Sequence, residues 1–253
     1  MPRIYYGPFN EQYNDYTTPS SGNAGRFPAG SKLVLPDERA YRFTENDGTA
    51  EVAGTLYQSA LPITNATETV VNVATAAGAT SLSSTLGGTA AAVDLYAEGT
   101  VHTNKTTGLG YAFRIKRAVA SGDGHAAVSS GAVITVNLAS PETLQVALTT
   151  SSELTYTQNR FRKVIIHASP PTAALVGVSP GVAAASRWYW SQTEGDAPVL
   201  ASGTLIIGDF AVPSASTGGV MPSAAFETDG PYVGVVRHVN ITAEIALIDL
   251  KLD

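Results

Sequence analysis

Short stretches of alternating apolar and polar residues recur along the chain, and turn residues separate nearly all of them. In one stretch, Tyr111, Phe113 and Ile115 fall on one side of an extended strand. Arg114 and Lys116 fall on the other side, because successive side chains of a strand point to opposite faces. This order predicts a strand with one buried face. Similar patterns predict strands at residues 32–35, 41–43, 69–73, 205–209, 232–236 and 244–252.

The most aromatic of these stretches lies in the C-terminal third of the chain. Trp188 and Trp190 share one face of the predicted strand, and Tyr189 lies on the other. We expect both tryptophans in the core of a C-terminal module. Gly195 and Asp196 follow, and this pair predicts a turn that ends the strand.

The strand pattern predicts an all-β protein with short antiparallel strands in two β-sandwich or barrel-like modules. A chain of 253 residues buries enough surface to fold without a disulfide or metal. Its 28 threonines are β-branched and suit a pleated surface, whereas strong helix formers are scarce. Residues 90–97 could form two helical turns, but Gly88 and Gly99 keep such a helix short.

The composition predicts three parts: an extended N-terminal arm (1–31), a central β domain (32–171) and a C-terminal β-barrel-like module (172–253). The second boundary follows Pro170 and Pro171, because adjacent prolines cannot continue a central strand. The arm has no apolar periodicity, so we expect it outside the core. Its tyrosines are candidate interaction residues, because tyrosine offers contact area at low entropy cost; the alternative is a terminus without a partner. They are Tyr5, Tyr6, Tyr13 and Tyr16.

Charge and composition narrow the classes of partner. Charged residues make up only 14% of the chain, against about 25% in typical proteins, so much of the surface is cheap to desolvate against another protein. The net charge of -6 argues against direct binding of nucleic acid. No apolar run approaches the roughly 18 residues of a membrane span. The absence of cysteine excludes thiolate chemistry and disulfides.

One catalytic motif occurs, but its context does not fit. Residues 177–181 match the G-x-S-x-G pattern of a hydrolase nucleophile elbow around Ser179. The residue after that serine is Pro180, which has no N–H for an oxyanion hole. The motif therefore predicts a Pro-Gly turn, and we expect no catalytic residue and no enzyme activity. A β-fold hydrolase with unrecognised carboxylates stays as an alternative that a deep pocket with two facing acids would support.

No pattern predicts a metal or a cofactor. The histidines lack the spacing of a zinc site and are expected to be core or solvated residues: His102, His125, His167 and His238. Two pairs of carboxylates stand near glycines without a calcium-loop pattern: Glu45 with Asp47, and Glu227 with Asp229. Two basic clusters could contact an acidic partner or be solvated strand faces: Arg114 with Lys116 and Arg117, and Arg160 with Arg162 and Lys163.

The C-terminal stretch resembles a known family in its succession of strands and turns. The resemblance is carried by 176–178, by 188–193 with Gly195 and 197–199, by 208–209 with 212–214, by 233–236 and by 246–250, and more weakly by 96–148. These segments are similar to virion structural proteins of tailed bacteriophages, especially head decoration or auxiliary capsid (cement) proteins of environmental phages. Such patterns transfer no functional residue, because these proteins act through surfaces.

The resemblance implies a non-enzymatic protein that binds the outer capsid surface and stabilises the head, after assembly in the host cytoplasm. Its expected partners are the major capsid protein and copies of itself, as a homotrimer or homodimer, with no direct contact to nucleic acid or membrane. The alternative is a carbohydrate- or receptor-binding β module of a phage tail fibre or spike. In that case Trp188, Tyr189 and Trp190 would stack on sugars, so their burial separates the two hypotheses.

Overall fold

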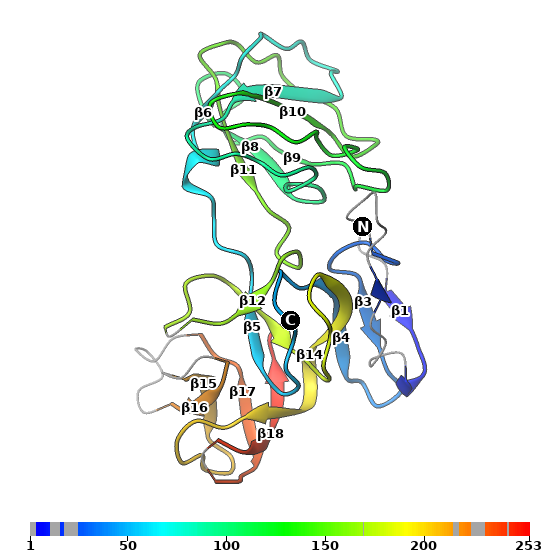
Figure 1. The fold of residues 1–253 in the computed structure, drawn as a ribbon, viewed down its shortest axis with the longest axis vertical. Coiled ribbons are helices and arrows are strands. Elements are labelled where there is room, and N and C mark those ends of the chain that lie inside the picture. The colour runs from blue at the N-terminus through cyan, green and yellow to red at the C-terminus, as the bar shows by residue number, and fades with distance from the viewer. Residues whose placement is uncertain are drawn as a thin grey trace. The chain divides into compact units, whose positions relative to one another are not determined.

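The computed structural model describes residues 4–10, 16–17, 25–168, 170–214, 218–223, 231–241 and 243–253. Its regular structure is almost entirely β, which confirms the predicted fold class (Figure 1). Among the described residues, no helix is long and apolar enough to cross a lipid bilayer.

The chain divides into two compact units. Unit 1 comprises residues 1–17, 25–61 and 160–253, and unit 2 comprises residues 18–24 and 62–159. These bounds differ from the predicted division at 31 and 171, because residues 32–61 and 160–171 belong with the C-terminal segment. The cause is long-range strand pairing, in which Phe43 lies opposite Trp190 and Leu56 opposite Val178. Local composition does not encode such partners.

In unit 1 the described residues form one 12-stranded sheet. The order along its main path is β1-β3-β4-β14-β18-β17-β15-β16, and the other strands branch from β14 and β5. Its strands are β1 (Ile4–Tyr6), β2 (Tyr16–Thr17), β3 (Lys32–Val34), β4 (Ala40–Glu45), β5 (Leu56–Gln58), β12 (Ile165–Ile166), β13 (Leu175–Val178), β14 (Arg187–Leu200), β15 (Phe210–Pro213), β16 (Val220–Pro222), β17 (Gly234–His238) and β18 (Ile245–Lys251). The predicted strand at 205–209 is not formed.

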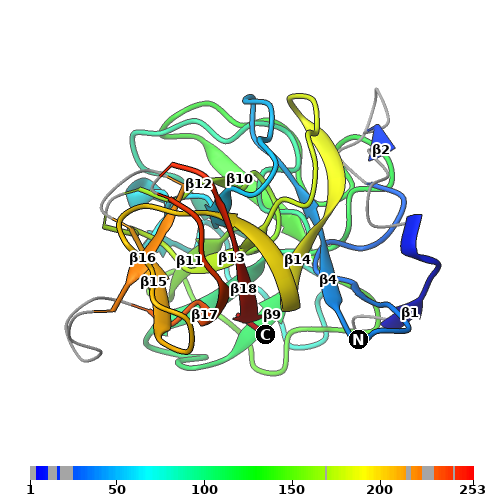
Figure 2. The same ribbon diagram turned by 90° about the horizontal axis from the view of Figure 1, so that it is seen from below.

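The long strand β14 is the spine of this sheet. Its first half pairs with β4, and its second half pairs with β18, beside which it runs in Figure 2. The predicted turn at Gly195 and Asp196 is wrong, because the strand continues to Leu200. The register to β4 shifts between Gln192 and Glu194, and Gly195 has a φ of 78°, which glycine adopts without strain. Pairing with β18 therefore carries β14 through residues that usually end a strand.

The core of unit 1 lies on both sides of β14. Trp188 and Trp190 are fully buried with Phe43, whose ring stacks on Trp188 at 5.1 Å between centroids. Tyr189 belongs to a separate cluster with Val164, as the alternation of a strand requires. A third cluster gathers apolar residues of the second half of β14 and of β18: Ala197, Val199, Ala246, Ile248 and Leu250 among others.

The prediction that residues 1–31 stay outside the core is wrong for the part that the structure describes. Strand β1 pairs in parallel with β3, and β2 pairs with the start of β14. Tyr5, Phe27 and Ala29 join the tryptophan cluster. The alternation around Tyr5 was too short to be recognised as a strand from the sequence alone.

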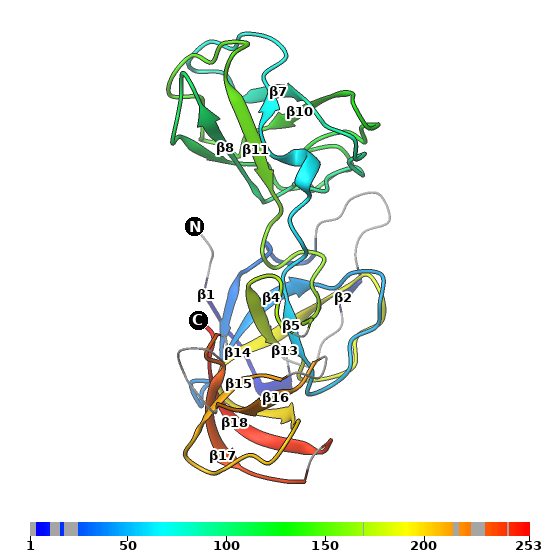
Figure 3. The same ribbon diagram turned by 90° about the vertical axis from the view of Figure 1, so that its left-hand side faces the viewer.

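Unit 2 contains two smaller sheets that share one apolar core. The first has the order β6-β11-β8-β9, and the second consists of β7 and β10; Figure 3 shows β8 beside β11. Leu82, Ile134 and Leu154 from the two sheets meet in a single cluster. The elements are a 3-10 helix η2 (Thr64–Ala66), β6 (Thr69–Val70), β7 (Ser81–Thr85), β8 (Thr100–Lys105), β9 (Ala112–Arg114), β10 (Val133–Asn137) and β11 (Glu153–Thr157).

The possible helix at 90–97 is not formed, and turns follow one another there instead. Asp94 and Glu98 have φ angles of 57° and 59°, in the left-handed region. The Asp94 carboxylate accepts hydrogen bonds from the backbone N–H groups of Gly122 and Gly124, at 2.6 and 2.8 Å. Those bonds hold the segment as a turn, because they fix its carboxylate on a neighbouring loop.

Candidate functional site

An exposed apolar surface lies at the N-terminal edge of the unit 1 sheet. Ile4 and Tyr6 of β1 expose 55% and 82% of their surface, and Phe9 exposes 49%. Among the described residues β1 pairs only with β3, so no described strand lies along its other edge. We call Ile4, Tyr6 and Phe9 the N-terminal surface. Open strand edges with apolar side chains are prone to pair with another chain, so proteins usually cover them.

Tyr5 anchors this surface from the opposite face of β1. Its ring meets Phe27 edge to face at 4.6 Å between centroids, and Trp190 at 6.5 Å. A slip of the strand by one residue would exchange the buried and exposed side chains, so Tyr5 also fixes the register with β3. The anchor therefore presents Ile4 and Tyr6 outward from a well-packed core.

The four candidate tyrosines do not act alike. Tyr5 is packed inside, Tyr6 is exposed, and the backbone of Tyr16 pairs with Trp188. Tyr13 lies outside the described residues. Ile4 and Phe9 were not predicted as interaction residues, because the apolar segment at residues 4–6 is too short to be recognised as a strand.

The aromatic strand does not form a sugar-binding platform. Trp188 and Trp190 have no exposed surface, and Tyr189 exposes only 4%. Aromatic rings that bind a sugar must offer a face to solvent, and these three do not. The three residues on which the carbohydrate-binding alternative was based are therefore not available to bind a sugar.

Ser179 has the geometry of a turn. The side chain is fully buried, and its hydroxyl donates a hydrogen bond of 2.6 Å to the backbone carbonyl oxygen of Gly181. Among the described residues, no histidine forms a hydrogen bond with this hydroxyl. The structure thus supports a Pro-Gly turn at this motif and gives Ser179 no base to activate it.

The four histidines do not come together. His125 and His167 are buried in different units, and His102 and His238 lie on different strands. Among the described residues, no group of three or more His, Cys, Asp or Glu side chains could hold a metal ion. Glu227 and Asp229 lie outside the described residues.

Both basic clusters are paired within the chain. Arg162 and Lys163 contact the buried carboxylate of Glu45, at 2.9 and 2.7 Å. Arg160 donates to the backbone carbonyl of Leu175. In unit 2, Arg114 and Arg117 lie 3.9 and 3.6 Å from Glu98, and Lys116 lies 2.7 Å from Asp123. Charges used in this way leave little for an acidic partner.

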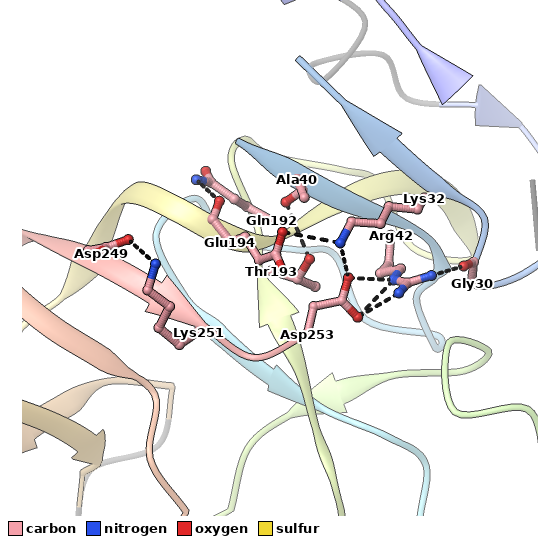
Figure 4. A network of polar contacts seen from close by, with 10 residues as sticks. All are labelled: Gly30, Lys32, Ala40, Arg42, Gln192, Thr193, Glu194, Asp249, Lys251 and Asp253. Carbon is pink, nitrogen blue, oxygen red and sulfur yellow. Dashed lines mark hydrogen bonds and ion pairs between the residues drawn. The ribbon is translucent and has the colours of Figure 1, made fainter. Parts of the chain in front are cut away.

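A polar network joins the end of β18 to β3 and β4 (Figure 4). The Asp253 carboxylate accepts from Lys32 at 3.0 Å and from Arg42 at 2.6 Å, and Lys32 also contacts Glu194 at 3.1 Å. Burial opposes the charge of Asp253, but the hydrogen bonds from Arg42 and Lys32 outweigh it and hold the pKa of this carboxyl below its usual value. The network is a structural clamp whose charges satisfy one another.

A small cavity of about 230 Å³ lies elsewhere in unit 1. Its lining includes the carboxyl-bearing residues Asp47 and Glu51, together with Tyr57, Ile165 and Ile166. A glycosidase needs its two carboxyls on either side of a scissile bond, and this volume is too small for two sugar rings. The cavity therefore does not support the glycosidase form of the hydrolase alternative.

Comparisons with known proteins identify no relative. No protein-family model matches the chain, and neither the curated proteins nor the solved structures contain a significant match. Functional conclusions must therefore come from the chemistry of this chain.

Proposed function

We propose that this chain is a non-enzymatic capsid decoration protein of a tailed bacteriophage. In this proposal it binds the outer surface of the head and stabilises it through contacts with the major capsid protein and with copies of itself, as a homotrimer or homodimer. The observation that carries the proposal is the N-terminal surface: a strand edge beside which no described strand lies, with exposed Ile4 and Tyr6, anchored on the tryptophan core by Tyr5.

Three further observations are in keeping with a structural role. Ser179 is buried in a turn, and residues of both basic clusters form ion pairs with carboxylates of the same chain. A surface poor in charge is cheap to desolvate, which favours repeated contacts among many copies. The tail-fibre alternative would now require sugar-binding residues other than Trp188, Tyr189 and Trp190.

The location is tested by mass spectrometry of purified virions with copy-number determination. We expect hundreds of copies per particle for a head protein. A few copies or a few tens would instead place the protein on the tail and refute the decoration proposal. Negative-stain imaging of the isolated chain then gives the symmetry of its oligomer.

The N-terminal surface is tested by point substitutions, because removing the first 30 residues would also remove Tyr5 and Phe27 from the core. We expect the double variant Ile4→Thr with Tyr6→Ser to weaken capsid binding or self-association at least tenfold while the fold stays intact. Val182→Ser is the matched control, because Val182 is 75% exposed and lies away from β1 in the sequence. Equal binding by the double variant and the control would exclude this surface.

A further inference from the structure

The cavity beside Glu51 combines buried acceptors with apolar walls. Glu51 lines it and has only 1% of its surface exposed. Its buried Oε2 atom makes no hydrogen bond of good geometry, although the side chains of Tyr57, Tyr189 and Asn46 lie close enough to act on the carboxyl as donors. A buried polar atom without a well-formed hydrogen bond costs about 1–3 kcal/mol, so such an atom is unusual in a native core. None of these three donors carries a positive charge.

A second buried glutamate in the same unit shows what is missing. Glu45 is fully buried, and the cations of Arg162 and Lys163 lie beside its carboxylate, at 2.9 and 2.7 Å. No ion pair joins Glu51 or Asp47 to a lysine or arginine within the described part of the chain. Two neighbouring carboxyls thus share one cavity without a positive charge.

The pKa of Glu51 is consistent with a carboxyl that has no positive charge beside it. Burial raises the pKa of its carboxyl to about 8, and the charge of Asp47 adds to the rise, while the Tyr57 hydroxyl opposes it. At neutral pH the Glu51 carboxyl is therefore mostly protonated. A cation would restore the ionised form, because an opposite charge nearby favours a carboxylate.

The walls limit which cation fits. Ile165, Ile166 and Ala50 offer methyl and methylene groups, which suit an aliphatic chain rather than a hydrated metal ion. At about 30 Å³ for each water-sized group, the volume suits a ligand of roughly seven non-hydrogen atoms. An ammonium group donates up to three hydrogen bonds, which matches a site rich in acceptors.

We propose that this cavity binds a primary alkylammonium ion. The ammonium group lies against the carboxyls of Glu51 and Asp47, and its methylene chain lies against Ile165 and Ile166. This chemistry is shared by a free aliphatic amine and by the lysine side chain of a partner protein. The site does not depend on the decoration role, so either proposal can fail without the other.

NMR and calorimetry measure the binding of three probes to the full chain. The probes are n-pentylamine, the neutral analogue pentan-1-ol, and Nα-acetyl-lysine N-methylamide. We expect pentylamine to bind and pentanol to fail. Since Glu51 passes from acid to carboxylate, binding at pH 7 should release about one proton, seen as a dependence of the heat on the buffer. Affinity should rise by up to tenfold per pH unit between pH 6 and 8 and then level off.

Substitutions separate this site from adventitious binding. We expect Glu51→Gln to weaken pentylamine binding at least tenfold and to abolish both the proton release and the pH dependence. Glu244→Gln is the matched control, because Glu244 is exposed and the chemical change is the same.

The outcomes decide both the class and the source of the ligand. Equal binding of pentanol, or unchanged amine binding by Glu51→Gln, would overturn the proposal. Binding of the lysine derivative as well as pentylamine points to a lysine of a partner protein. Binding of pentylamine alone points to a free amine, and both of these results support the site.

Discussion

The two units bury their ionisable groups in different ways. In unit 2 one apolar cluster fills the core, and Asp94 is held by backbone N–H groups. In unit 1 three apolar clusters flank the buried charges of Glu45 and Arg162 and the unpaired carboxyl of Glu51. Unit 1 thus buries an arginine–glutamate pair and a carboxyl of raised pKa, whereas the buried Asp94 of unit 2 is held by backbone N–H groups.

The largest expected effect breaks the buried ion pair of unit 1. Arg162→Met leaves the fully buried Glu45 with Lys163 alone, and removing one partner of a buried pair costs about 3–5 kcal/mol. Urea unfolding measures the loss, followed by tryptophan fluorescence for unit 1, which holds both tryptophans, and by far-UV circular dichroism for both units. Lys105→Met in unit 2 is the control, because Lys105 contacts Glu153 from an exposed position; we expect no change beyond error. Equal effects of the two changes would remove this difference between the units.

A core substitution in unit 2 tests whether the units unfold separately. Leu154 is fully buried in the unit 2 cluster, so Leu154→Ala should cost about 2–5 kcal/mol. Both tryptophans belong to unit 1. We therefore expect the unfolding seen by far-UV circular dichroism to shift while the fluorescence midpoint stays constant. A parallel shift of both signals would mean that the units unfold together.

The pH dependence of stability should trace to Glu51. Its pKa is about 8 in the folded protein and lies near 4.5 in the unfolded chain, so the folded state binds the extra proton between these values. Its contribution is complete below pH 4.5 and is lost as the pH rises toward 8, by at most about 1.4 kcal/mol per pH unit. Glu51→Gln should flatten the unfolding free energy over this range. An unchanged slope in the variant would assign it to other groups.

The smallest expected effects compare two buried tyrosine hydroxyls. The hydroxyl of Tyr156 in unit 2 bonds to Ser84 at 2.7 Å, so Tyr156→Phe should cost about 1 kcal/mol. The buried hydroxyl of Tyr189 in unit 1 makes no hydrogen bond of good geometry, and Tyr189→Phe should leave stability unchanged or slightly raised. Thermal unfolding of both variants shows which substitution costs more stability. A larger loss of stability for Tyr189→Phe than for Tyr156→Phe would contradict this prediction.

The sequence predicted what local patterns encode. The alternation around Phe113 and Ile115 gave the correct buried side, and the order Trp188, Tyr189, Trp190 gave the correct two faces. The turn at Gly195 was wrong, and the two compact units have other bounds than the predicted parts, because both features depend on pairing with strands distant in the sequence. No local pattern indicates that Glu51 would be buried or that its carboxyl would lack a cation, since these follow from the packing of Tyr57 and Tyr189 around it.

Strand β4 can complete its pairing only after β14 has been synthesised, which delays the folding of the N-terminal part of unit 1. Phe43 of β4 lies opposite Trp190 of β14. Strand β14, the main partner of β4, is therefore made only after residues 62–159 of unit 2 have been synthesised. At about 5–20 residues per second, this interval is on the order of 10 s. During that time β4 has only β3 beside it, and Tyr41 and Phe43 remain uncovered on the nascent chain. A chaperone that binds aromatic segments should therefore associate with this hairpin during translation and leave once β14 emerges.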